Sequence, residues 1–298
     1  MKARVRSFAS FIVIVGVLIA MWEGYKAMGT ATGGTWPLTD VELPVRTNAR
    51  SMPHVWDIVG VLFTEAQRGR ETLLITVLLE AALFTLRSAL IGFVVGSMIG
   101  GAIGILFVRS PLAERGLTPF MVASQTVPVL LIAPLVVIWS RRADYPIWVP
   151  VGVISAYLAF YPVAVNMVKG LRSPEATATE LMRSYAASPR QVLWKLQIPS
   201  AIPYLFPAFK VAATLSVIGA VVGELPSGIQ NGLGRAILSF ASTFSSAPEK
   251  LFASVLVAAL LGLVFVGVLT LVERLTIPSG SRIDYEPTTS AIGQAGAQ

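Results

Sequence analysis

Long apolar stretches separated by shorter polar ones dominate this chain. A helix needs about 20 apolar residues to cross a hydrocarbon layer of about 30 Å. The clearest stretch runs from Leu251 to Val272 and holds no charged residue. Six stretches reach this length and predict six transmembrane helices: Phe8 to Met28, Thr72 to Val108, Thr118 to Ser140, Ile147 to Val168, Tyr204 to Gly223 and Leu251 to Val272.

Two of the six stretches depart from a simple straight span. Thr72 to Val108 is too long for one span, and its glycines gather in its second half. We expect a helix lying along the membrane surface that runs into a tightly packed membrane helix, because small residues let neighbouring backbones approach closely. Thr118 to Ser140 contains Pro119, Pro128 and Pro134, so we expect this span to be kinked or broken.

The composition agrees with this pattern. Hydrophobic residues make up 54% of the 298 residues and charged residues only 13%, whereas soluble domains carry about 25% charged residues. So few charges cannot cover a soluble core of this size, and the chain is therefore an all-α integral membrane protein. Interleaved basic and aromatic patches are absent, which argues against nucleic acid as a partner. Cysteine is absent too, and we expect the single histidine, His54, to be a surface residue.

The distribution of Lys and Arg predicts the orientation. With the N-terminus inside, the cytoplasmic segments hold twelve basic residues and the external segments hold eight. An even number of spans places both termini on one side, which we take as the cytoplasm. Gly29 to Arg70 is then external, and Lys169 to Pro203 is cytoplasmic.

The same pattern divides the chain into four parts. Residues 1–28 are expected to form an N-terminal transmembrane anchor, since no small-residue site for signal cleavage follows the apolar run. Residues 29–71 form an external linker, in which Val55 to Phe63 has the spacing of a short helix on the membrane surface. Residues 72–277 form the membrane core, and residues 278–298 form a disordered cytoplasmic tail.

The connection over residues 173–203 is much more elaborate than a simple turn between membrane helices. Ser173 followed by Pro174 is typical of a helix N-cap with proline at the first helical position. Thr177 and Glu180 offer a capping box a few residues later instead. The helix that follows carries three apolar residues on one face: Leu181, Met182 and Tyr185.

A second short helix is predicted after the junction at Ala186 and Ala187. Ser188 and Gln191 form a Ser-x-x-Gln capping box at its start, and Pro199 is expected to end it. Exposed amphipathic helices of this kind need a partner surface, either in their own bundle or on another protein. The apolar side of this second helix consists of Val192, Leu193 and Leu196.

This connection resembles the EAA loop of binding-protein-dependent ABC importer permeases. The pattern of that loop is Glu-Ala-Ala, a Gly three residues later, and then Ile-x-Leu-Pro. Glu180 matches the glutamate, which is either a coupling residue or an ordinary helix-capping carboxylate. The end of the pattern is matched by Leu196, Ile198 and Pro199.

The loop also departs from the family pattern. Leu181 and Met182 replace the paired alanines, and Ala186 replaces the glycine. Because alanine tolerates a positive φ poorly, a left-handed backbone is not expected at Ala186.

Other stretches resemble the nitrate, sulfonate, taurine and bicarbonate branch of this family. In chain order they read TLRSALIGFVVGSMIGGAIGIL, SQTVPVLLIAPLVVIW, FYPVAVNMVKGLRS and IPYLFPAFKVAATLSVIGAVVGELPSGIQNGLG. The resemblance extends from Met52 to Ile277.

The resemblance implies a type I ABC importer permease-like fold in a bacterial inner (plasma) membrane. The chain would form the path for a small solute, with a second permease subunit (homo- or heterodimer), two cytoplasmic ATP-binding subunits and an external solute-binding protein as partners. The partner ATPase would bind ATP and Mg, because no G-x-x-x-x-G-K-[ST] motif is present. No catalytic, cofactor or metal site is expected in this chain. The implied coupling residues are Glu180, Leu181, Tyr185, Ala186, Ala187, Ser188 and Pro199.

Five further residues are candidates for the translocation path or its gates. Broken backbone at membrane depth is tolerated mainly where it lines protein or a cavity, so Gln125, Pro128 and Pro134 are expected to line the path. Charge inside an apolar span is costly and functional by default, and for Lys210 we favour a structural or gating role over solute contact. Glu224 is either an ordinary helix-end carboxylate or part of the outer gate.

Two other classes of membrane protein fit the sequence less well. A secondary transporter normally shows paired repeats and buried acidic or histidine relays. An intramembrane enzyme needs a Ser/His, His/Glu or paired Asp constellation, and none is present. The solute stays open, because similar permeases handle aliphatic sulfonates, taurine, nitrate, riboflavin and thiamine precursors.

Overall fold

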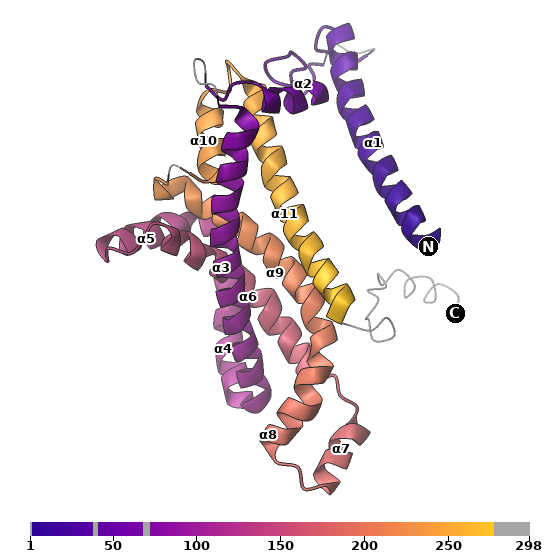
Figure 1. Ribbon diagram of the computed structural model, residues 1–298, viewed down its shortest axis with the longest axis vertical. Coiled ribbons are helices and arrows are strands. Elements are labelled where there is room, and N and C mark those ends of the chain that lie inside the picture. The colour runs from indigo at the N-terminus through magenta and orange to yellow at the C-terminus, as the bar shows by residue number, and fades with distance from the viewer. Residues whose placement is uncertain (1, 38–40, 68–71, 230, 277–298) are drawn as a thin grey trace. The chain divides into compact units, whose positions relative to one another are not determined.

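A computed structural model describes residues 2–37, 41–67, 72–229 and 231–276, and helices joined by short connections make up most of these ranges (Figure 1). The β-structure within them consists of two isolated bridges, Thr35–Glu42 and Glu65–Leu73. Within the described ranges, five helices are long and apolar enough to cross a membrane, and the number is six if the bent pair of α4 and α5 is counted as one broken span. The predicted all-α membrane fold is confirmed. The predicted tail, residues 278–298, lies outside the described residues.

The chain divides into two compact units. The first unit comprises Met1–Thr85 and Gly228–Leu261, and the second comprises Leu86–Ser227 and Gly262–Gln298. Two helices, α3 and α11, contribute residues to both units. The helices have these bounds: α1 Lys2–Ala31, α2 Val55–Gly60, η1 Val61–Phe63, α3 Leu74–Arg109, α4 Pro111–Thr126, α5 Val129–Arg142, α6 Trp148–Leu171, α7 Ala176–Ser184, α8 Pro189–Val192, η2 Leu193–Gln197, α9 Ile198–Ser227, α10 Leu233–Ser242 and α11 Pro248–Thr276.

In the first unit, side chains of α1 hold the start of α2. The Trp22 indole donates to the carbonyl of Pro53 at 3.1 Å. The Glu23 carboxylate accepts from the Val55 N–H at 2.8 Å and lies 2.7 Å from Nδ1 of His54. The predicted short helix is confirmed as α2 and η1, and its place on the membrane surface stays a prediction. The His54 side chain is 37% exposed, as expected for a residue near the surface.

The predicted division of Thr72 to Val108 into two helices is wrong, because α3 is one continuous helix of 36 residues. Such a helix is about 54 Å long, well beyond the thickness of the hydrocarbon layer. Its first turns have partners within the first unit, where Leu74 and Leu78 are fully buried. The Thr85 hydroxyl also accepts a buried hydrogen bond from the Leu233 N–H at 3.0 Å. The position of these first turns at the membrane surface stays a prediction.

In the second unit, α3 packs on α6 through glycines spaced four residues apart. A methyl group on Gly96 would lie 2.7 Å from the carbonyl oxygen of Ala156, and one on Gly104 would lie 2.6 Å from Cβ of Met167. The predicted close packing through glycine is confirmed. The four glycines of α3 whose added Cβ would collide with α6 are Gly92, Gly96, Gly100 and Gly104.

The proline-rich span is broken, as predicted. α4 and α5 meet at 97°, and Pro128 is the N-cap of α5. Val127, which precedes it, has φ −76° and ψ 121°, because a following proline disfavours the helical conformation. Pro119 and Pro134 lie within the two helices and do not interrupt them.

Candidate functional site

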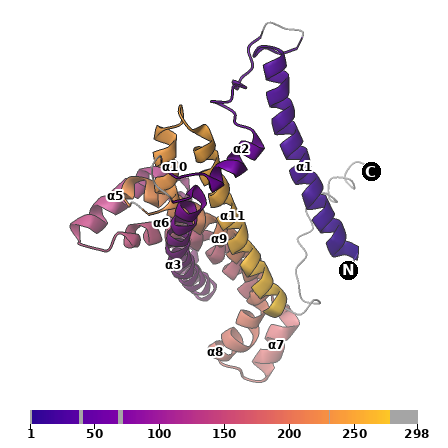
Figure 2. The same cartoon turned by 45° about the horizontal axis from the view of Figure 1, so that its top comes forward.

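The loop that resembles the EAA loop forms two short helices, α7 and α8, at one end of the second unit (Figures 1 and 2). The Gln191 N–H donates to Oγ of Ser188 at 3.3 Å, and the Ser188 N–H donates to Oε1 of Gln191 at 2.7 Å. The predicted capping box is therefore confirmed, with α8 beginning at Pro189.

The first of these helices begins at Ala176, so both predicted starts are wrong. Its N-cap is Glu175, which makes no side-chain capping bond. Ser173 instead donates its hydroxyl to the carbonyl of Gly170 at 2.8 Å and so satisfies the end of α6. Glu180 lies exposed midway along α7. Its carboxylate makes no hydrogen bond or ion pair with the residues that the structure describes, so a capping role has no support.

Ala186 adopts the left-handed conformation that its side chain disfavours, with φ at +50°, so the expectation for this position is wrong. The Ala186 N–H donates to the carbonyl of Arg183 at 2.9 Å, and the Ala187 N–H donates to that of Met182 at 3.0 Å. This pair of bonds is the Schellman motif, which usually places glycine at the left-handed position. The conformation costs alanine roughly 1–2 kcal/mol, and the two bonds offset part of that cost.

Pro199 does not end the second helix, contrary to the prediction. Leu193–Gln197 form a π turn, η2, and the chain runs on into α9. The wider turn relieves the clash between a proline ring and the carbonyl four residues earlier. The helical segment Pro189–Ser227 is therefore continuous over 39 residues, and α8 is an extension of a membrane helix.

Three large apolar side chains of this loop are exposed. Leu181 is 57% exposed, Tyr185 78% and Trp194 67%, and we call these three residues the loop ridge. The neighbouring Leu193 is buried and anchors the loop to α6 and α9. The apolar pattern around Leu193 did not single out Trp194, because a pattern of apolar positions does not show which of two adjacent residues stays exposed. The cluster around Leu193 contains Met167, Leu171 and Ala201.

An ion pair that the sequence did not reveal braces the base of the loop. Arg172, at the end of α6, donates from Nη1 and Nη2 to the two carboxylate oxygens of Glu114 at 3.0 and 2.7 Å. The hydrogen bonds that Arg172 donates to Glu114 raise the pKa of its guanidinium. The pair joins the end of α6 to the first turn of α4, across 58 positions of sequence.

The predicted path residues at the α4–α5 break are exposed in this chain. Gln125 lies at the end of α4, Pro128 at the break and Pro134 within α5. The Tyr157 hydroxyl of α6 donates to the carbonyl of Ser124, so one side of the break is fastened to α6. The three exposed residues are free to face a path, and that role stays a prediction.

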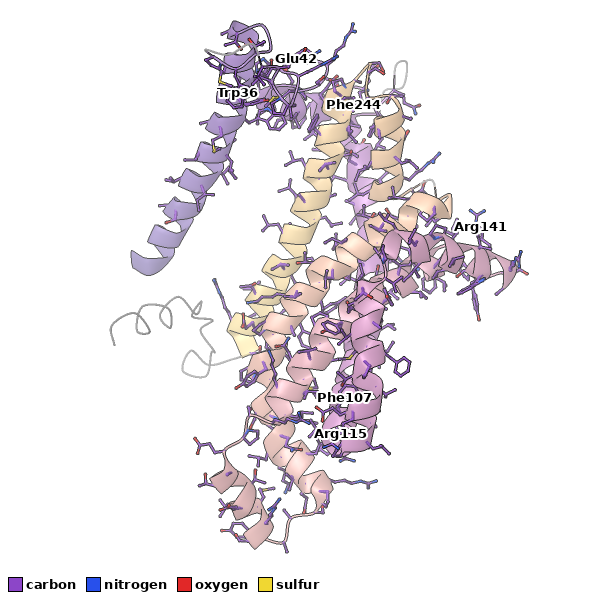
Figure 3. The ribbon with its side chains drawn as sticks, turned by 180° about the vertical axis from the view of Figure 1, so that it is seen from behind. Trp36, Glu42, Phe107, Arg115, Arg141 and Phe244 are labelled. Atoms are coloured by element: carbon purple, nitrogen blue, oxygen red, sulfur yellow. The ribbon has the colours of Figure 1, made fainter. Side chains whose placement is uncertain are left out.

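The charged candidates Lys210 and Glu224 both lie in α9. Nζ of Lys210 is 2.6 Å from Oε2 of Glu273 in α11, which supports a structural role for this lysine. Glu224 is fully buried about one turn before the end of α9, so it is not an ordinary exposed helix-end carboxylate. At that end, Arg141 of α5 donates to the carbonyl of Ser227 at 2.5 Å (Figure 3).

Removing one partner of the Lys210–Glu273 pair leaves the other charge partly buried. We expect Lys210→Met to lower the free energy of unfolding by about 1–2 kcal/mol, an amount reduced by the partial exposure of the pair. The exchanged pair Lys210→Glu with Glu273→Lys is expected to recover most of the loss in a thermal unfolding measurement. Lys169→Met, at an exposed position with no ion pair among the described residues, is the control. An exchanged pair as unstable as Lys210→Met would contradict the structural role.

Comparison with known proteins shows to which family this chain belongs. Residues 92–277 match the family described as the binding-protein-dependent transport system inner membrane component. The formylaminopyrimidine transport permease ThiX of Halalkalibacterium halodurans is 32% identical, over 65% of this chain and 75% of its own length. The riboflavin transport permease RibX of Chloroflexus aurantiacus is 30% identical, over 66% of this chain and 71% of its own length.

The fold agrees with solved transporters. The chain matches an inward-facing MetNI methionine ABC transporter with a TM-score of 0.59 and 16% identity, covering 68% of this chain and 98% of that one. These findings support an importer permease and give no support to a secondary transporter. The chain therefore belongs to the binding-protein-dependent inner membrane components and is a permease subunit of an ABC importer.

Proposed function

We propose that α7 and α8 are the element through which this permease docks on a cytoplasmic ATPase. The observation that carries the proposal is the loop ridge, Leu181, Tyr185 and Trp194, which exposes two aromatic side chains, one at the end of α7 and one in η2. Tyr and Trp are enriched among residues that dominate binding energy at protein interfaces. Glu180, on the same helix as Leu181, adds an exposed carboxylate with no partner among the described residues.

The anchoring of the loop supports a mechanical role. α8 continues through η2 into α9, the Leu193 cluster packs the loop on α6, and the pair of Arg172 with Glu114 joins α6 to α4. A push on the loop ridge is therefore transmitted to three membrane helices as a rigid-body movement, which is how two packings of a transporter interconvert. The ATPase would bind ATP and Mg and supply the push on closing.

The complete importer would contain two permease subunits, two ATPases and an external solute-binding protein. The solute is proposed to be a small organic molecule or an oxyanion, in line with related permeases that are named for formylaminopyrimidine, riboflavin, aliphatic sulfonates and nitrate. Affinity purification of this permease from its native membrane should recover an ATPase subunit in equal amount. Purification without any ATPase would contradict the docking proposal.

The docking proposal requires α7 and α8 to be cytoplasmic, with both termini on the same side and residues 29–70 external. The chain has no cysteine, so single cysteines report on orientation directly. We expect a membrane-impermeant maleimide to label Arg46→Cys in intact spheroplasts, and to label Arg190→Cys only in inverted vesicles. Both arginines are exposed. Labelling of Arg190→Cys from outside would refute the orientation.

A further inference from the structure

The first unit contains a cavity of about 450 Å³. Three parts of the first unit line it: Ala66, Gln67 and Thr72, the part of α3 from Val77 to Phe84, and residues 231–240, which include most of α10. Protein pockets that bind small molecules measure about 300–1,000 Å³. The volume therefore suits one small solute, and none of the predicted path residues lies in this cavity.

Hydrogen bonds fix the walls of the cavity. Nζ of Lys250 donates to the carbonyls of Glu65 and Ala66 at 3.1 and 2.9 Å, which holds the segment that carries Gln67. The buried bond from the Leu233 N–H to the Thr85 hydroxyl ties the first turn of α10 to α3. A site with walls that are already held loses less conformational freedom when a ligand binds.

Two opposite charges line the cavity. Glu80 comes from α3 and Arg235 from the first turn of α10. Neither side chain forms an ion pair or a hydrogen bond within the described part of the chain. Glu80 lies in a highly apolar helix, where an ionisable residue points to a functional role. A bound molecule would therefore meet a carboxylate acceptor and a guanidinium donor that no other described residue engages.

The remaining lining residues narrow the class of solute. Phe84 and Phe240 contribute two phenyl rings, and Gln67 and Ser239 contribute uncharged hydrogen-bonding groups. A simple oxyanion would be repelled by Glu80 and would gain nothing from the phenyl rings. A wholly apolar molecule would make no use of the two charged groups.

We propose that this cavity is a solute-binding site of the permease itself, for a small planar nitrogen heterocycle that carries both hydrogen-bond donors and acceptors. Ring nitrogens or carbonyl groups accept from Arg235, an amino group donates to Glu80, and the flat ring contacts Phe84 and Phe240. The inference rests on the transport function, and it does not depend on how α7 and α8 dock.

Formylaminopyrimidine is a suitable probe, because it is a single planar ring with amine donors and ring-nitrogen acceptors. Its binding is measured by titration calorimetry on the full-length permease in lipid nanodiscs, with and without the ATPase. We expect Glu80→Gln and Arg235→Gln each to weaken binding about tenfold, as expected for the loss of a hydrogen bond to a charged group. Phe240→Ala is expected to weaken it as well.

Matched controls lie in the same unit outside the cavity. They are Glu42→Gln, Arg46→Gln and Phe244→Ala, and Figure 3 labels Glu42 and Phe244. These variants should bind the probe like the unaltered protein, and all variants should share its unfolding temperature. If Arg235→Gln folds poorly, Arg235→Lys takes its place in the test. This variant keeps the positive charge and should retain part of the affinity for the probe.

Several results would overturn the proposal. They are absence of probe binding, equal affinity of cavity and control variants, and tighter binding of nitrate than of the pyrimidine. The proposal would also be overturned if the cavity variants bound the probe normally but no longer bound the external solute-binding protein. The cavity would then be a contact surface for that protein. Failure of the ATPase to associate, with probe binding intact, would refute only the docking proposal.

Discussion

We expect Tyr185→Ala to reduce ATP-driven uptake about ten- to a hundredfold, because truncating an aromatic anchor at a protein interface costs about 1–3 kcal/mol. The side chain is 78% exposed within this chain, so its removal costs little folding stability. The measurements are subunit retention, ATP hydrolysis and uptake in reconstituted complexes, all on the same preparation. Solute-stimulated ATP hydrolysis should fall together with uptake.

Glu180→Ala should act in the same direction, since its carboxylate is exposed on the same helix. Tyr145→Ala is the matched control, because Tyr145 is also strongly exposed, at 60%, but lies in the connection between α5 and α6. Normal uptake with normal subunit retention in both Tyr185→Ala and Glu180→Ala would show that α7 and α8 are only a folded connection between membrane helices.

The second large effect is expected at the contact between α3 and α6. A Cβ on Gly100 would collide with the carbonyl of Phe160 and lie 3.0 Å from the backbone nitrogen of Ala164. Both neighbours are backbone atoms, so the helices must separate to admit a methyl group. We expect Gly100→Ala to lower the free energy of unfolding by about 1–3 kcal/mol, as overpacking does in other tightly packed interiors. Thermal unfolding in nanodiscs measures the change.

The adjacent Gly101 provides an unusually close control. A Cβ at this position meets no atom within 4 Å, and alanine is the better helix former by about 1 kcal/mol. Gly101→Ala should therefore leave stability unchanged or raise it slightly. Equal destabilisation by Gly100→Ala and Gly101→Ala would mean that α3 needs glycine at these positions for the flexibility of the helix and not for its contact with α6.

Features with a local cause follow from the sequence. The apolar stretches predict the membrane helices, because the hydrocarbon layer requires that length and composition. Pro128 predicts the break between α4 and α5, and Ser188 with Gln191 predicts the start of α8, because a proline ring and a capping side chain act within a few residues. The glycine spacing in α3 likewise indicates close packing, although its partner helix is not apparent.

Features with a distant cause required the three-dimensional structure. The first turns of α3 continue without a break into the rest of the helix, and there Leu74 and Leu78 are buried against the rest of the first unit. The left-handed Ala186 is held by hydrogen bonds to the preceding helix, whose end was predicted only approximately. In both cases the surroundings outweigh the preference of the residue itself.

The ion pairs and the cavity also depend on residues that are distant in the sequence. Lys210 and Glu273 are 63 positions apart, and Arg172 and Glu114 are 58 apart. The charges of the cavity, Glu80 and Arg235, come from helices that lie far apart in the chain. Composition and periodicity report which residues prefer an apolar or a polar environment. Which of them meet depends on the packing of distant helices, and this is why the sequence indicates a membrane permease while its ion pairs and its cavity appear only in the folded chain.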